Sequence, residues 1–370
     1  MKNSLFLFLF LCAFVNSHAQ HNKLNLLIGT YTTKCDSKGI YVYDFDSKTG
    51  DFNYKNATEN VINPSYLTIS KDKNFVYAVN ENGANSTVSS FKFESNTGKL
   101  HFLNKENSKG EDPCYIIDDN KNVIVANYSS GTIAVFGKES NGSISKAKQV
   151  IQHYAIGHNS YRQEKPHAHM VYFSPDNKYV LANDLGIDKV FSYAYNPDSS
   201  DEILKIKDSI SVKSGNGPRH LIFSKNGKFI YLLNELAGSI TVFSYFNGIL
   251  KQKGENSLIS KDFIGTIGAA DIHISPDGKF LYATNRGTAN NISTFKIFKN
   301  GRLKFVAQNS TLGKGPRNFV IDPTGNFLLV AHQYTNDVVI FRRNKKNGKL
   351  TDTKKKINLC SPVCLVFSEK

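Results

Sequence analysis

The chain has 370 residues, no tryptophan, 26 phenylalanines and 18 tyrosines, and its formal net charge is +15. This length suits one large domain or two ordinary ones, and the many aromatic residues favour β-structure. No long apolar segment of helical period follows the first twenty residues, which argues against a helical or α/β fold. The positive charge comes almost wholly from dispersed lysines. A nucleic-acid-binding surface would need clustered charge, so no nucleic-acid partner is expected.

The first twenty residues differ from the rest of the chain. Lys2 is followed by the apolar run Leu5–Val15 and then by Ser17-His18-Ala19, a small-x-small cleavage pattern. This pattern predicts a signal peptide over residues 1–20, cleaved after about residue 19, and a periplasmic or secreted domain over residues 21–370. The apolar run is short for a membrane span, so no stable span is expected after cleavage.

Four cysteines remain after the predicted cleavage: Cys35, Cys114, Cys360 and Cys364. An oxidising compartment permits disulfides, and four cysteines allow three connectivities between which the sequence does not decide. Cys114 and Cys364 lie in apolar strand contexts, which favours buried free thiols for these two.

The mature chain begins with three predicted strands, at Leu24–Thr30, Gly39–Phe45 and Asp51–Thr58. Six similar β-hairpins follow at intervals of roughly 50 residues. They lie at Asn63–Glu81, Asp112–Tyr128, Pro166–Gly186, Pro218–Leu236, Ala269–Gly287 and Pro316–Gln333. In the hairpin at Pro218–Leu236, alternating apolar residues flank Asn226-Gly227, which predicts a two-residue turn.

Each hairpin is followed by a third apolar run and a weaker fourth run, which is the pattern of a β-propeller blade. The three N-terminal strands lack a first strand, and the C-terminal run Ser361–Ser368 resembles a first strand with nothing after it. The sequence therefore predicts an all-β, seven-bladed β-propeller with four antiparallel strands per blade. The first blade would be closed by N- and C-terminal strands, which removes exposed sheet edges. We expect a monomer.

The antiparallel hairpins predict a site at one mouth of the central channel. The start of each first strand and the end of each second strand lie at the same end of a hairpin. The first-strand positions are Ser65, Cys114, His169, Arg219, Ala270 and Arg317. The second-strand positions are Glu81, Tyr128, Asp184, Glu235, Arg286 and Gln333. An asparagine precedes five of the latter, at Asn80, Asn127, Asn183, Asn234 and Asn285, and its recurrence indicates a structural role.

A long connection, Ile151–Lys165, leads into the fourth blade and carries Arg162, and long loops in compact domains are often functional. The predicted catalytic residues are His167, His169, Arg219, Glu235 and Arg286. The predicted substrate-binding residues are Glu81, Tyr128, Arg162, Asp184, His220, Arg317 and Gln333. No zinc-like, calcium-like, dinucleotide-binding or serine-nucleophile motif is present, so no metal or cofactor is expected.

Several predicted site residues have a structural alternative. Arg219, Arg286 and Glu235 could form ion pairs between blades, and the histidines of Pro166–His169 could bond to the backbone. Glu81 and Asp184 are open to both interpretations. For His220 we favour a position in the core or behind the site.

Six consecutive blade motifs resemble those of the bacterial lactonase family of seven-bladed propellers. They include NPSYLTIS, RQEKPHAHM, GPRHLIFS, SPDGKFLYATNRG and GPRNFVIDPTGNFLLVAHQ. The family includes propeller-type 6-phosphogluconolactonases and fungal carboxy-muconate cyclases. The resemblance implies hydrolysis of a lactone, or its reverse, without an obligatory metal.

In the cyclase branch a histidine, two arginines and a glutamate at the channel mouth are implicated. By motif these fall on His167 or His169, Arg219, Arg286 and Glu235. Two positions depart from the family pattern, since Tyr115 and Thr288 stand where histidine is common. These departures leave the lactone unspecified.

Two classes of function follow from the sequence. In the first, a small anionic or polar lactone is hydrolysed: arginines stabilise the oxyanion, and Glu235 or a histidine of Pro166–His169 activates water. A muconate-lactone cyclase-like reaction is a variant of this class. In the second, the exported propeller binds a sugar acid, a glycan or a protein without catalysis, because propellers host many functions.

Overall fold

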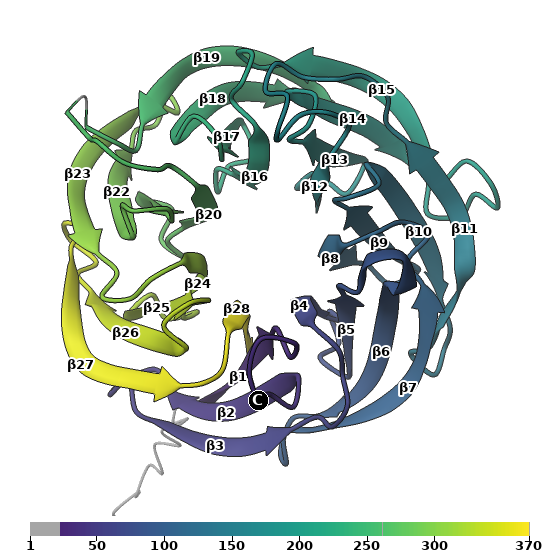
Figure 1. Ribbon diagram of the computed structural model, residues 1–370, viewed down its shortest axis with the longest axis horizontal. Helices are drawn as coiled ribbons and strands as arrows, with labels where there is room; N and C mark the ends of the chain where they lie inside the picture. The colour runs from purple at the N-terminus through teal and green to yellow at the C-terminus, as the bar shows by residue number, and fades with distance from the viewer. Residues whose placement is uncertain (1–22, 261, 370) are drawn as a thin grey trace, which may run out of the picture.

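The computed structural model describes residues 23–260 and 262–369, and the predicted signal peptide over residues 1–20 lies outside them. Seven four-stranded antiparallel sheets surround a central channel, as Figure 1 shows. The predicted seven-bladed propeller is therefore confirmed. No helix among the described residues is long and apolar enough to cross a membrane.

The blades are numbered here from the one that holds both chain ends, and their strands are given from the channel outwards. Blade 1 consists of β28 (Pro362–Glu369), β1 (Lys23–Thr30), β2 (Ile40–Asp46) and β3 (Phe52–Ala57). Blade 2 consists of β4 (Pro64–Ile69), β5 (Phe75–Asn80), β6 (Thr87–Glu94) and β7 (Lys99–Asn107), with the short 3-10 helix η1 (Gly83–Asn85) after β5. Blade 3 consists of β8 (Pro113–Asp118), β9 (Asn122–Asn127), β10 (Thr132–Lys138) and β11 (Ile144–Gln152).

The remaining four blades follow in chain order around the ring. Blade 4 consists of β12 (Ala168–Phe173), β13 (Tyr179–Asp184), β14 (Lys189–Tyr195) and β15 (Leu204–Ser211). Blade 5 consists of β16 (Pro218–Phe223), β17 (Phe229–Asn234), β18 (Ser239–Phe246) and β19 (Ile249–Ser257). Blade 6 consists of β20 (Ala269–Ile274), β21 (Phe280–Asn285), β22 (Asn291–Ile297) and β23 (Leu303–Ser310). Blade 7 consists of β24 (Pro316–Ile321), β25 (Phe327–His332), β26 (Asp337–Arg343) and β27 (Leu350–Asn358).

Aromatic side chains of several second strands attach a blade to the outer turn of the next blade. The hydroxyl of Tyr231 donates to the carbonyl of Gly301 at 3.1 Å, and that of Tyr282 donates to the carbonyl of Gly348 at 2.7 Å. The Phe229 ring packs on Gly301, where an added Cβ would lie 2.4 Å from the ring and where φ is +82°. Glycine is therefore required at this turn both by its backbone conformation and by the close approach of the ring.

The ring is closed by the two chain ends, as expected. Strand β28 pairs with β1 from Leu24–Glu369 to Thr30–Pro362, so the C-terminus supplies the innermost strand of blade 1 (Figure 1). A disulfide between Cys35 and Cys360, 325 residues apart in sequence, adds a covalent link at the same closure. Cys114 and Cys364 are buried free thiols, which agrees with the sequence expectation.

Two local predictions were wrong. The turn around Asn226-Gly227 is not a two-residue turn, because strands β16 and β17 are separated by residues 224–228. In blade 4, Ala168 pairs with Asp184, as Pro218 pairs with Asn234 in blade 5. Asp184 therefore takes the place of the recurring asparagine, and Leu185 follows it at the channel mouth. The sequence analysis had assigned Asn183 to the position of the recurring asparagine, which aligned blade 4 one residue away from its true register.

A β-bulge recurs at the second residue of the innermost strands. In blade 5, Pro218 pairs with Asn234 and His220 pairs with Leu233, so Arg219 is an extra residue without a partner. The equivalent extra residues are Ser65, Cys114, His169, Arg317 and Val363. Bulges redirect side chains and are common beside active sites. Because the bulges lie at the start of the innermost strands, a site can be built at this end of the channel.

Candidate active site

A cavity of about 320 Å³ occupies the channel mouth at which the bulges lie. Its lining combines bulge residues, residues that directly follow second strands, and loop residues. The lining residues are Tyr31, Glu81, Asp112, Cys114, Tyr128, Ser129, Arg162, His169, Glu235, Arg286 and Arg317. Seven predicted site residues are thus brought together here: Glu81, Tyr128, Arg162, His169, Glu235, Arg286 and Arg317.

Glu235 is the electrostatic centre of the site. Its Oε2 lies 2.9 Å from Nε of Arg219 and 3.0 Å from Nη2 of Arg286, and its Oε1 accepts a hydrogen bond from Nη2 of Arg162 at 2.8 Å. The three guanidinium groups come from the bulge of blade 5, the end of β21, and the loop between β11 and β12. One carboxylate among three cations gives this cluster a local surplus of positive charge, while Arg317, Glu81 and Asp112 also line the cavity.

The pKa of Glu235 reflects this surplus of cations. Burial by itself would raise the pKa, but Arg286, Arg219 and Arg162 outweigh burial and lower the pKa to about 2. The carboxylate is therefore ionised at neutral pH and tied to three partners. Such a group is a poor proton acceptor, because its oxygens are already engaged by guanidinium groups.

Arg219 lies beneath the cavity rather than in its lining, and its side chain is only 2% exposed. Burial, with the neighbouring charge of Arg286, lowers its pKa to about 10. Its Nε finds no hydrogen-bond acceptor at a suitable angle, although Glu235 is close. The structure thus places this predicted catalytic residue behind Glu235.

A second, smaller charge group faces the Glu235 cluster. The hydroxyl of Tyr31 donates to Oε2 of Glu81 at 2.9 Å, and Nη2 of Arg317 lies 3.8 Å from Oε1. The Arg317 guanidinium also lies 5.4 Å from the centre of the Tyr31 ring. Burial raises the pKa of Glu81, with Arg317 opposing the shift.

The two candidate histidines occupy different environments. His169 lines the cavity, and burial together with the charge of Arg219 holds its pKa well below the ordinary value. His167 lies outside the lining: its Nδ1 is 3.1 Å from the Tyr128 carbonyl, its Nε2 is 3.2 Å from Glu164, and its ring stacks on Tyr128. His169 is therefore a neutral imidazole at the cavity, whereas His167 supports Tyr128.

Three predicted binding residues lie away from this cavity. Asp184 is fully buried and accepts hydrogen bonds from the backbone N–H groups of His167 and Gly186, with Nδ1 of His153 at 2.6 Å. Its role is to hold the chain before β12. His220 is buried behind Arg219. Gln333 lines a neighbouring cavity of about 440 Å³ that shares Tyr31, Glu81 and Asp112 with the first.

Sequence reasoning missed four lining residues: Tyr31, Asp112, Cys114 and Ser129. Tyr31 could have been found from the repeat, because it follows β1 as Glu81 follows β5. Asp112 and Ser129 bond to each other, with 2.6 Å between Ser129 Oγ and Asp112 Oδ2. Cys114 was among the first-strand positions predicted at the mouth, but its apolar neighbours favoured a core role, and burial raises the pKa of its thiol.

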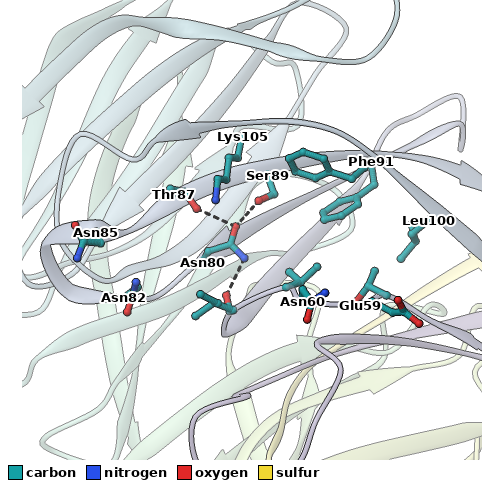
Figure 2. A pocket seen from close by; sticks show the side chains of 14 residues that line it. Glu59, Asn60, Asn80, Asn82, Asn85, Thr87, Ser89, Phe91, Leu100 and Lys105 are labelled. Carbon is teal, nitrogen blue, oxygen red and sulfur yellow. Dashed lines mark hydrogen bonds between the residues drawn. The ribbon is translucent and has the colours of Figure 1, made fainter.

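A larger cavity of about 650 Å³ lies between blades 1 and 2. At its centre Asn80 donates to the carbonyl of Ile62 and accepts from the hydroxyl groups of Ser89 and Thr87, as Figure 2 shows. Its charged lining residues are Glu59 and Lys105 only. The polar groups bond to one another and no charges converge, so size alone does not make this cavity the site. No group of three or more His, Cys, Asp or Glu side chains in the described part of the chain is arranged to hold a metal ion.

Comparisons with known proteins show the family of the chain. The family described as "Lactonase, 7-bladed beta-propeller" matches residues 25–367, and the chain belongs to this family. A Formosa agariphila protein named 6-phosphogluconolactonase is 38% identical over 332 residues, 88% of this chain and 94% of the relative. A Bacillus subtilis protein of the same name is 34% identical, covering 92% of this chain and 97% of the relative. The solved structure of a Pseudomonas aeruginosa periplasmic gluconolactonase is 36% identical with a TM-score of 0.89, covering 93% of this chain and 99% of that chain.

The low pKa of Glu235 predicts how stability depends on pH. Because the folded pKa of about 2 lies below the ordinary value of 4.5, the cluster stabilises the fold above pH 4.5 and this contribution is lost as the pH falls towards 2. Between pH 5 and pH 3 the free energy of unfolding should fall by about 2 kcal/mol through this group. Glu235→Gln should lack this part of the fall in urea titrations at each pH. An equal fall in both proteins would contradict the ion cluster.

Proposed function

We propose that the protein hydrolyses a small lactone of the aldonolactone type at the channel mouth. The observation that carries this proposal is the single carboxylate of Glu235 among three guanidinium groups, in a chain that belongs to a lactonase family. The local positive charge of this cluster suits an anionic substrate and the oxyanion that forms when water attacks its carbonyl carbon.

Oxyanion stabilisation is assigned to Arg286 and Arg162, because both line the cavity. A well-placed donor at such a site contributes about 3 kcal/mol to transition-state stabilisation. Arg219 orients Glu235 from below, and Glu235 in turn holds the guanidinium groups apart. This assignment moves Arg219 from direct substrate contact to support, since its side chain is almost fully buried.

His169 is assigned as the general base. Its neutral imidazole can take a proton from water while the water oxygen bonds to the lactone carbonyl carbon. When the ring C–O bond breaks, the imidazolium returns the proton to the leaving alkoxide, and the product is a hydroxy acid. Glu235 does not suit this role, because both of its carboxylate oxygens are engaged by guanidinium groups.

His169→Asn should lower kcat for D-glucono-1,5-lactone at least about 100-fold, because it removes the base and keeps much of the side-chain volume. Acid release is followed with a pH indicator against the spontaneous rate. His101→Asn is the matched control, since His101 is half-exposed on outer strand β7. Unchanged turnover in a folded His169→Asn protein would overturn the base assignment. No hydrolysis by the unaltered protein of this lactone or of its 6-phosphate would overturn the proposed function.

Arg162 should determine how strongly KM depends on the charge of the substrate. The named relatives differ in whether their lactone carries a phosphate, and Arg162 is the most exposed guanidinium of the cluster, with 43% of its side chain accessible. Arg162→Gln should raise KM for 6-phosphogluconolactone about 10-fold and raise KM for gluconolactone less, because a phosphate loses a charged partner. Equal changes in KM for both lactones would show that Arg162 does not contact the phosphate.

We further propose that the protein acts outside the cytoplasm. The N-terminal sequence pattern, the Cys35–Cys360 disulfide and the periplasmic location named for the Pseudomonas relative support this. In a periplasmic extract, mass spectrometry should find a chain that starts near residue 20. After denaturation, two of its four cysteines should resist alkylation until reductant is added. An intact N-terminus together with four reactive thiols would contradict export.

A further inference from the structure

Arg317 lines the cavity, but the proposed reaction does not use it. It is the extra residue of the bulge in blade 7, and its side chain is 18% exposed. Two other lining residues accompany it: Tyr31, which follows β1 in blade 1, and Glu81, which follows β5 in blade 2. Blades 1 and 2 lie across the channel from blade 5, which carries Glu235 (Figure 1). Tyr31, Glu81 and Arg317 therefore form a second wall of the cavity, which we call the Arg317 wall.

The arginines that line the cavity differ in their hydrogen bonds. Arg162 donates to Glu235 at 2.8 Å, and Nη2 of Arg286 lies 3.0 Å from the same carboxylate. Arg317 makes no hydrogen bond with any residue that the structure describes. Its Nη2 is 3.8 Å from Glu81, which is too far for a hydrogen bond, and none of its nitrogens is sealed within the protein. The N–H groups of Arg317 are therefore open to a ligand in the cavity.

Two contacts hold the Arg317 guanidinium without using its donors. The guanidinium lies 5.4 Å from the centre of the Tyr31 ring, a cation–π contact that needs no N–H group. Glu81 attracts it as a charge, and the hydroxyl of Tyr31 holds that carboxylate by donating to Oε2 at 2.9 Å. The position of the guanidinium is thus set before a ligand arrives, which reduces the entropy that binding costs.

The charge of the Arg317 wall differs from that of the Glu235 cluster. Arg317 and the Tyr31 hydroxyl both favour the ionised form of Glu81, so a carboxylate balances the guanidinium. Asp112 adds a further negative charge near Glu81. The wall therefore presents N–H donors without a surplus of positive charge. Such donors suit the oxygen of a neutral hydroxyl group, which can accept a hydrogen bond, better than they suit a second anion.

We propose that Arg317 determines the specificity of the site for polyhydroxylated lactones by donating hydrogen bonds to hydroxyl oxygens of the bound ring. Its effect on turnover rests on the proposed lactonase function, whereas its effect on binding does not. The Glu235 cluster takes the reacting carbonyl, and the Arg317 wall takes hydroxyl groups on the other side of the ring. A site that hydrogen-bonds hydroxyl groups rejects an analogue that lacks them, because its polar groups are then left unpaired.

A comparison of two lactones tests this specificity. D-Glucono-1,5-lactone and δ-valerolactone have the same six-membered ring, and only the first carries hydroxyl groups. Arg317→Lys keeps a positive charge beside Glu81 but loses the planar set of donors. It should lower the ratio of kcat/KM for gluconolactone to kcat/KM for valerolactone about 10-fold.

Arg302→Lys is the matched control. Arg302 also lies near an aromatic ring, that of Phe298, but on the turn between β22 and β23 at the far end of blade 6. Its substitution should leave the ratio within about 2-fold of that of the unaltered protein. An unchanged ratio in a folded Arg317→Lys protein would overturn the proposal. Equal losses for the two lactones would also overturn it, because they would show that Arg317 acts on the carbonyl that both share.

A binding measurement does not depend on activity. 1,5-Anhydro-D-glucitol has the ring and the hydroxyl groups of gluconolactone but no carbonyl, so it is not hydrolysed. In saturation-transfer NMR it should bind the unaltered protein, and Arg317→Lys should raise its Kd about 10-fold. No binding, or an equal Kd in the two proteins, would overturn the proposal even if the lactonase is active. Binding that depends on Arg317 in a protein without lactonase activity would support the proposal and refute the proposed function alone.

Discussion

The structure depends on closing the ring. A blade of four strands has two faces to bury, and each face can be covered only by a neighbouring blade. The pairing of β28 with β1 supplies the last blade and leaves every other blade with two neighbours. The Cys35–Cys360 disulfide reinforces the same point covalently. Aromatic contacts between successive blades, such as Tyr231 with Gly301, add to the attachment of one blade to the next.

The site is a consequence of this closure. The lining of the cavity is drawn from the bulges and strand ends of blades on different sides of the channel, so no single blade contains it. Glu235 illustrates the effect, since its three cationic partners come from three separate segments. Burial alone would raise the pKa of Glu235 and disfavour its ionised form. The three arginines outweigh burial and keep the carboxylate ionised. The result is a fixed carboxylate that organises cations, and the neutral His169, which lines the same cavity, is the base that we propose.

Much of the fold was readable from the sequence because propeller blades repeat. The strand pattern, the division of blade 1 between the two chain ends and the end of the channel that carries polar residues all followed from aligning six hairpins. The same alignment failed at Asn183-Asp184, where two adjacent polar residues allowed a shift by one, and only the pairing of Ala168 with Asp184 resolved it. It also left out Tyr31, because the first blade is split and its second strand was not aligned with the others.

The sequence by itself determined the architecture, since apolar alternation and turn residues act locally and recur in every repeat. It also determined which residue types gather at the mouth, since strand polarity follows from the chain order. Only the tertiary structure decided what these residues do. Whether Arg219 faces the cavity or lies beneath Glu235, whether His167 or His169 lines the cavity, and how far the pKa of His169 is lowered all depend on burial and on charges from other blades. Such electrostatic effects depend on distances between segments far apart in the chain, which no local pattern records.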